Sequence, residues 1–145
     1  MRISQVLAAK ASADIIFVRP DASVRELIAR LAEHNVGALV VSSDGSTLEG
    51  IVSERDVVRR LHDDESVLEK PVSAIMTAEV HTCAETDRVD DLMRVMTERR
   101  IRHLPVLRDG SMVGIISIGD VVKSRMSELE FERDQLDSYV HRAQT

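Results

Sequence analysis

The chain carries one stretch twice: Gly50-Ile51-Val52-Ser53-Glu54-Arg55-Asp56 returns as Gly114-Ile115-Ile116-Ser117-Ile118-Gly119-Asp120. The glycine, the serine and the aspartate each recur at an offset of 64 residues. Two copies of one motif in matching surroundings indicate a duplicated structural unit. The duplication decides the fold class and directs the search for a functional site.

The repeat extends well beyond the motif. Four apolar residues with the i, i+3, i+4, i+7 spacing of an amphipathic helix recur at an offset of 65: Val24, Leu27, Ile28 and Leu31 return as Val89, Leu92, Met93 and Met96. The apolar runs 36–41 and 101–106 and the pairs Asp44-Gly45 and Asp109-Gly110 keep this offset. Asp-Gly between two apolar runs predicts a tight hairpin turn.

Each unit therefore predicts strand, helix, strand, tight turn, strand and helix. The first strands are expected at 15–18 and 80–83, and a short lead precedes each unit at 3–7 and 72–76. The predicted fold class is α/β, with two β-α-β-β-α repeats packed as one pseudo-twofold module and a C-terminal helical extension. The predicted boundaries are 1–65, 66–125 and 126–145, with a polar connector at 62–71.

Composition limits the class of protein. With 43% hydrophobic, 30% charged and 2% aromatic residues, the chain can bury a core built of Leu, Val, Ile and Met. Apolar runs stay far below the ~20 residues of a membrane span, and the N-terminus lacks the pattern of a signal peptide. Cys83 is the one cysteine, so a cytoplasmic protein is expected. A net charge of −6 argues against nucleic-acid binding through Arg99, Arg100, Arg102 and His103.

The doubled pattern Gly-hydrophobic-hydrophobic-Ser-x-x-Asp, each time after an amphipathic helix and a short strand, resembles a tandem pair of CBS domains over roughly residues 1–125. The segment 102–106 also resembles the second strand of that family. The resemblance implies a sensor or regulatory module that binds AMP, ADP, ATP, NAD or S-adenosylmethionine in the cleft between the repeats. It also implies a disc-shaped homodimer.

The chemistry of the motif fits this ligand class. A carboxylate accepts two hydrogen bonds, so Asp56 or Asp120 can hold the 2′ and 3′ hydroxyls of a ribose. Ser53 and Ser117 can donate to a phosphate or sugar oxygen. The alternative is that these aspartates and serines only cap the helices that follow.

Glycine at Gly50 and Gly114 allows a ligand or a neighbouring strand to approach the backbone.

Further side chains are expected to complete the nucleotide sites. Arg59 and Lys123 stand three residues after each aspartate, and Arg55 occurs only in the first motif. Because Arg102 and His103 correspond to Gly37 and Ala38, the two sites should differ, and the second should hold phosphates through Arg102 and His103. An apolar slot for adenine is expected from Ile16 and Phe17 or His81, above Val52 or Ile116. The alternative for Arg59 and Lys123 is that they are solvated charges on the helix surface and do not contact phosphate.

No sequence motif of catalysis is present, so we expect a binding protein and not an enzyme, with no catalytic cofactor and no metal. The alternative is a scaffold with vestigial nucleotide sites that acts through its tail. There, Val122, Met126, Leu129, Leu136 and Val140 form a narrow apolar stripe, with Arg133 interrupting it. This helix either lies on its own domain, joins a dimer or holds an unidentified partner protein.

Overall fold

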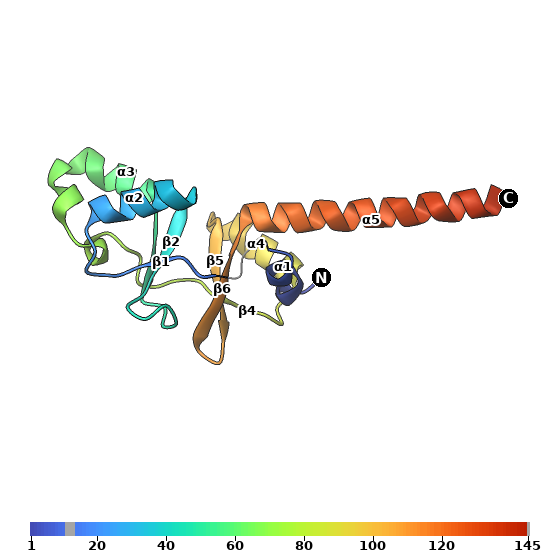
Figure 1. Ribbon diagram of the computed structural model, residues 1–145, viewed down its shortest axis with the longest axis horizontal. Coiled ribbons are helices and arrows are strands. Elements are labelled where there is room, and N and C mark those ends of the chain that lie inside the picture. Colours follow the sequence, from blue (N-terminus) through green and yellow to red (C-terminus); the bar gives the residue numbers. More distant parts are fainter. Residues whose placement is uncertain (11–13, 145) are drawn as a thin grey trace.

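Two three-stranded sheets, each covered by helices, form the body of the molecule, and one long helix extends away from it (Figure 1). The computed structural model describes residues 1–10 and 14–144. The first repeat consists of β1 (Phe17–Val18), α2 (Val24–His34), β2 (Ala38–Val41), β3 (Gly50–Ser53) and α3 (Glu54–Asp63). The second repeat consists of β4 (Cys83–Ala84), α4 (Val89–Arg99), β5 (His103–Arg108), β6 (Ser111–Ser117) and α5 (Ile118–Gln144). Outside these elements lie α1 (Ile3–Ala8) and the 3-10 helices η1 (Glu65–Glu69) and η2 (Val72–Ala74).

The predicted fold class is confirmed, and the two sheets share one topology. In each repeat the first strand pairs parallel with the second, which pairs antiparallel with the third. The first strands begin later than predicted, at Phe17 and Cys83, and each holds two residues.

The two hairpins differ. β5 and β6 are joined by the predicted tight turn, with φ of 51° at Asp109 and 83° at Gly110. β2 and β3 are joined by a longer loop, so the prediction of a tight turn is wrong for the first repeat. There the Asp44 carboxylate accepts hydrogen bonds from the amides of Ser46 (2.8 Å) and Thr47 (2.7 Å). This side chain organises the loop in place of a two-residue turn.

The short leads are exchanged between the repeats. The amides of Ile3 and Ser4 donate to the carbonyls of Asp87 and Glu85, which lie in the second repeat. Sixty-nine residues later, Val72 and Ser73 donate to Ala22 and Pro20, which lie in the first repeat. The four acceptors correspond to each other at the offset of 65, so the exchange obeys the internal symmetry.

The two hydrophobic cores confirm this exchange. Ile3 and Val6 of α1 are buried with residues of β5, β6 and α4, while Val72 and Ile75 are buried with residues of α2 and β2. Each core is therefore completed by a segment that precedes the other repeat in the chain. The domain boundaries at 65 and 125 remain a prediction, and α5 crosses the second of them as one uninterrupted helix.

Within residues 1–10 and 14–144, no helix is long and apolar enough to cross a membrane.

The exchanged lead yields a stability prediction. Ile3 is 0% exposed, so Ile3→Ala should lower the free energy of unfolding by about 2–5 kcal/mol through lost burial and a residual cavity. Val58→Ala in α3, where the side chain is 67% exposed, should change it by less than about 0.5 kcal/mol. Urea unfolding measures both values.

A double-mutant cycle separates the two cores. The losses in unfolding free energy of Ile3→Ala and Leu104→Ala should be non-additive, because both side chains lie in the core of the second repeat. The losses of Ile3→Ala and Leu39→Ala should add, because Leu39 lies in the core of the first repeat. Coupling with Leu39 and additivity with Leu104 would contradict the exchange of leads.

Candidate functional site

Two cavities lie between the repeats, and each contains one copy of the duplicated motif. The Asp56 cavity, lined by Ser53 and Asp56 among others, has a volume of about 360 Å³. The Asp120 cavity, which includes Ser117 and Asp120, has a volume of about 870 Å³. Both volumes fall within the ~300–1,000 Å³ typical of small-molecule sites.

Each cavity combines the motif of one repeat with the strand starts of the other. The residues of the second repeat that line the Asp56 cavity include four with basic or imidazole side chains: His81, Arg100, Arg102 and His103. The Asp120 cavity receives their counterparts at the offset of 65, which are Ile16, Asn35, Gly37 and Ala38. The same four positions therefore carry basic or imidazole side chains in the second repeat and uncharged side chains in the first. Gly37, Ala38 and His103 line both cavities.

The motif serine and aspartate form a reciprocal helix cap. Ser53 is the N-cap of α3, and its Oγ accepts from the Asp56 amide at 3.3 Å. Asp56 Oδ2 in turn accepts from the Ser53 amide at 2.9 Å and from the Ser53 hydroxyl at 3.1 Å. At the start of α5, Ser117 donates its amide to Asp120 Oδ2 at 2.9 Å, and the Asp120 amide donates to Ser117 Oγ at 3.1 Å.

The helix-capping alternative is thus confirmed, and ligand binding by the same aspartates stays a prediction. These cap contacts fall on Oδ2 of both aspartates, so Oδ1 takes no part in the cap. The cap fixes each carboxylate in the wall of its cavity. A rigid acceptor at the start of a helix is well placed for a ligand hydroxyl.

Other segments of the chain pack directly against the two motif glycines, Gly50 and Gly114. A Cβ on Gly50 would lie 2.9 Å from the Thr77 carbonyl oxygen, and one on Gly114 would lie 2.6 Å from Leu7 Cδ2. Ile51 and Thr77 exchange two backbone hydrogen bonds at this approach. Of the two predicted reasons for glycine, close approach of the chain itself is the one observed.

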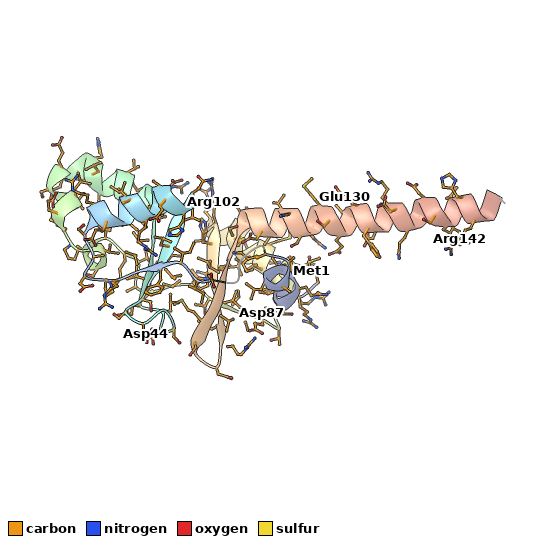
Figure 2. The ribbon with its side chains drawn as sticks, in the orientation of Figure 1. Met1, Asp44, Asp87, Arg102, Glu130 and Arg142 are labelled. Atoms are coloured by element: carbon orange, nitrogen blue, oxygen red, sulfur yellow. The ribbon has the colours of Figure 1, made fainter. Side chains whose placement is uncertain are left out.

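Basic side chains gather in the Asp56 cavity. Arg55 and Arg59 of α3 line it together with Arg100 and Arg102. Arg102, labelled in Figure 2, was expected beside the second motif, but it lines the Asp56 cavity, which contains the first motif. The start of β5 faces the other repeat, which sequence alone does not reveal. Lys123 lines the Asp120 cavity as predicted.

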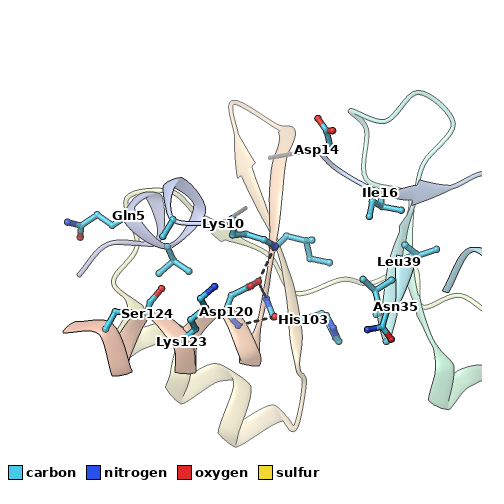
Figure 3. A pocket seen from close by; sticks show the side chains of 18 of the residues that line it. Gln5, Lys10, Asp14, Ile16, Asn35, Leu39, His103, Asp120, Lys123 and Ser124 are labelled. Carbon is cyan, nitrogen blue, oxygen red and sulfur yellow. Dashed lines mark hydrogen bonds and ion pairs between the residues drawn. The ribbon is translucent and has the colours of Figure 1, made fainter. Parts of the chain in front are cut away.

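Lys10 is a site residue that the sequence reasoning missed. Its Nζ forms an ion pair with Asp120 Oδ2 at 3.0 Å and donates to the Ile115 carbonyl at 2.7 Å (Figure 3). Burial alone would raise the pKa of Asp120, but the Ser117 amide and Lys10 hold it below its ordinary value. Lys10 follows the lead helix α1, so only the exchange of leads brings it here.

Arg100 and Asn35 were also missed as lining residues. Both have left-handed backbone, with φ of 55° and 53°, at the C-termini of α4 and α2. That conformation is uncommon for arginine and frequent for asparagine. The offset of 65 between them was the signal that could have marked both positions.

His103 lies between the two cavities. Burial lowers its pKa below the ordinary value; Asp120 and Glu54 oppose this shift, while Lys10 and Arg102 add to it. His103 Cε1 is 3.8 Å from where a Cβ on Gly37 would stand. An imidazole that holds its proton more weakly than usual therefore lines both cavities.

The adenine slot is only partly as predicted. Ile16 lines the Asp120 cavity and His81 the Asp56 cavity. Phe17, the next residue after Ile16, packs on Gly45 instead, because successive residues of an extended chain face opposite sides. Ile116 is fully buried in the second core and lines neither cavity.

No group of three or more His, Cys, Asp or Glu side chains that could hold a metal occurs in the described part of the chain. Burial, with a smaller contribution from Asp87, raises the pKa of the Cys83 thiol to about 12. Its Sγ donates to the Pro105 carbonyl at 3.6 Å. Cys83 therefore has the properties of a packed side chain and not those of a nucleophile.

Comparisons with known proteins agree with this architecture. A CBS domain-containing mitochondrial protein of Arabidopsis thaliana, CBSX3, is 36% identical over 146 residues, which cover 95% of this chain and 71% of that protein. The crystal structure of a CBS-domain protein of Agrobacterium tumefaciens superposes with a TM-score of 0.82 at 39% identity, covering 86% of this chain and 99% of that one.

Two further solved structures carry ligands. A CBS domain protein of Pyrobaculum aerophilum, complexed with AMP, is 28% identical with a TM-score of 0.71, over 83% of this chain and 89% of that one. The CBS domain pair of protein MJ0100, in complex with 5′-methylthioadenosine and S-adenosyl-L-methionine, is 26% identical with a TM-score of 0.74, over 85% and 98%. The family model of the CBS domain matches residues 3–63 and 72–127, so this chain belongs to the CBS-domain family as a tandem pair.

Proposed function

We propose that the chain is an adenine-nucleotide sensor that binds its ligand in the cavities between the repeats. The observation that carries the proposal is the placement of a capped Ser-x-x-Asp pair in the wall of each cavity, opposite residues of the other repeat. A ligand in either cavity would contact both repeats at once. The proposal makes the chain a binding module and not an enzyme.

The ribose is the part of the ligand that the motif suits. Asp56 and Asp120 each keep Oδ1 outside the helix cap, where it can accept hydrogen bonds from the vicinal hydroxyls. Adenosine is shared by AMP, ADP, ATP, NAD and S-adenosylmethionine. The ligands in the structures of the P. aerophilum CBS protein and of the CBS domain pair of protein MJ0100 all contain an adenosine moiety, which supports this ligand class.

Phosphate groups should favour the Asp56 cavity. Four arginines line it: Arg55, Arg59, Arg100 and Arg102. Guanidinium groups bind phosphate oxygens in pairs and keep their charge throughout the physiological range. The Asp120 cavity has two lysines, Lys10 and Lys123, and Lys10 is already paired with Asp120. We therefore assign the nucleotide phosphates to the Asp56 cavity.

Regulation would follow from the position of the cavities. A ligand shifts a conformational equilibrium only by the difference in its affinity for two states. A nucleotide that bridges β3 and α3 of one repeat to β5 of the other binds best to one arrangement of the repeats. The disc-shaped homodimer and the cytoplasmic location remain predictions beside this proposal.

Thermal unfolding with AMP, ADP, ATP, NAD and S-adenosylmethionine tests the function. A ligand at 100 times its Kd should stabilise the folded protein by ~2.7 kcal/mol. Asp56→Ala should abolish the stabilisation by a phosphate-bearing nucleotide. Asp120→Ala, which removes the equivalent cap from the other cavity, should retain it. Both variants should lose about 0.5–2 kcal/mol of basal stability with the cap, so the ligand-induced difference is the quantity compared.

Absence of stabilisation by all five ligands would reject the nucleotide proposal and favour the scaffold. Stabilisation that survives Asp56→Ala and vanishes with Asp120→Ala would reject the assignment of the phosphates.

The affinity for the nucleotide should depend on pH through His103. A bound phosphate raises the depressed pKa of this imidazole, so binding takes up a proton and tightens as the pH falls from 8 to 6. One proton limits the effect to less than about tenfold per pH unit. Isothermal titration calorimetry should show the wild-type affinity rising relative to His103→Gln, a comparison that cancels the titration of the phosphate itself. A constant ratio would exclude His103 from the phosphate site.

A further inference from the structure

The start of β5 joins the Asp56 cavity to the motif of the second repeat. The side chains of Arg102 and His103 line the Asp56 cavity. In the sheet, His103 pairs with Ser117 of the second motif. The Arg102 carbonyl accepts a hydrogen bond from the Ile118 amide at 2.9 Å. These two residues therefore line the cavity of one motif with their side chains and hold the other motif with their backbone.

The amide that Arg102 holds is the first of the long helix α5, which begins at Ile118. The first four amides of a helix have no partner within the helix, so each needs an acceptor from outside it. The Arg102 carbonyl supplies one acceptor, and Ser117 Oγ supplies another to the Asp120 amide at 3.1 Å. Arg102 therefore helps to fix the direction in which α5 leaves the sheet.

The first repeat has the same backbone bond without the side chain. There the Glu54 amide, the first of α3, donates to the Gly37 carbonyl at 2.9 Å. Gly37 lines the Asp120 cavity but has no side chain with which to hold a ligand. Through this pair of bonds, a ligand can therefore act on a helix start in one direction, from the Asp56 cavity to α5.

The helix α5 can carry a small change at its start to a distant point. It has 27 residues, against 10 in α3, and it extends away from both repeats (Figure 1). At 1.5 Å per residue its length is about 40 Å, so a tilt of about 5° at its start moves its end by about 3.5 Å. The helix does not lie on its own domain, since its apolar stripe is about half or more exposed: Val122, Met126, Leu129, Leu136 and Val140.

We propose that Arg102 couples the Asp56 cavity to α5: a phosphate bound by its guanidinium restrains its backbone, and the restrained carbonyl fixes the start of the long helix. A guanidinium can hold two phosphate oxygens at once, which limits the freedom of the whole residue. This coupling rests on the proposed function, which supplies the phosphate. It adds the route by which an occupied cavity acts on a distant part of the molecule.

Ile118→Pro tests the hydrogen bond. Proline is favoured at the first position of a helix and after an extended residue, and it has no N–H to donate. This variant removes the bond to the Arg102 carbonyl and leaves every residue that lines the Asp56 cavity in place. Ile118→Ala is the matched control, because it loses the same 47%-exposed side chain and keeps the amide.

Hydrogen exchange of the Asp120 amide, followed by NMR, measures how firmly the start of α5 is held. AMP at 100 times its Kd should slow this exchange by about fivefold in wild type and in Ile118→Ala, the low end of typical allosteric coupling, and leave it unchanged in Ile118→Pro. AMP that binds but slows the exchange equally in both variants would overturn the coupling alone. AMP that does not bind wild type would overturn the coupling together with the proposed function.

A second pair of variants tests the side chain. Arg102→Ala and Arg59→Ala each remove one guanidinium from the Asp56 cavity, but Arg59 lies on α3 of the first repeat. With AMP at 100 times the Kd of each variant, Arg59→Ala should keep the slower exchange at Asp120, and Arg102→Ala should lose it. Equal slowing in the two variants would overturn the role of Arg102. The comparison at position 118 decides the coupling even where Arg102→Ala no longer binds AMP.

Discussion

The reciprocal contact between a serine and the aspartate three residues later is the interaction on which the rest of the structure depends. It joins β3 to α3 and β6 to α5, and it sets the direction in which each helix leaves its sheet. The same contact holds a carboxylate in the wall of each cavity. Local folding, and ligand recognition under the proposed function, thus use the same pair of side chains in each repeat.

The two cavities show how a duplicated unit acquires different chemistry. Their architecture is related by the internal symmetry, but four corresponding positions carry different side chains. His81, Arg100 and Arg102 line the Asp56 cavity, and Ile16 and Asn35 line the Asp120 cavity, while Gly37, Ala38 and His103 line both. Because backbone positions are shared, such divergence changes the charge of a site without disturbing the fold. One cavity is rich in guanidinium groups, and the other contains an ion pair formed by the protein itself.

Much of the fold was readable from the sequence because its signals are local. Apolar spacing placed α2 and α4, and Asp109-Gly110 placed the turn between β5 and β6. The family resemblance then supplied the pairing of the repeats. The hairpin at Asp44 was misread because a side chain, and not the backbone of the turn, holds that loop.

The composition of the site was less predictable, since it depends on contacts between distant segments. Arg102 was assigned to the wrong motif, and Lys10 was missed, because both assignments require knowing which repeat each segment faces. Phe17 and Ile116 were expected at the ligand because they neighbour the right strands, yet the alternation of strand residues turns them into packed positions.

The exchange of leads has a consequence for how the chain is made. Ile3 leaves the ribosome before either repeat, but the core that receives it contains Leu104 and Ile116. Its burial must wait until most of the chain has been synthesised. Meanwhile Val72 and Ile75 can already complete the first core. The first repeat can therefore fold during translation, while the N-terminal segment, which is synthesised earlier, packs into its core only after the second repeat has been synthesised.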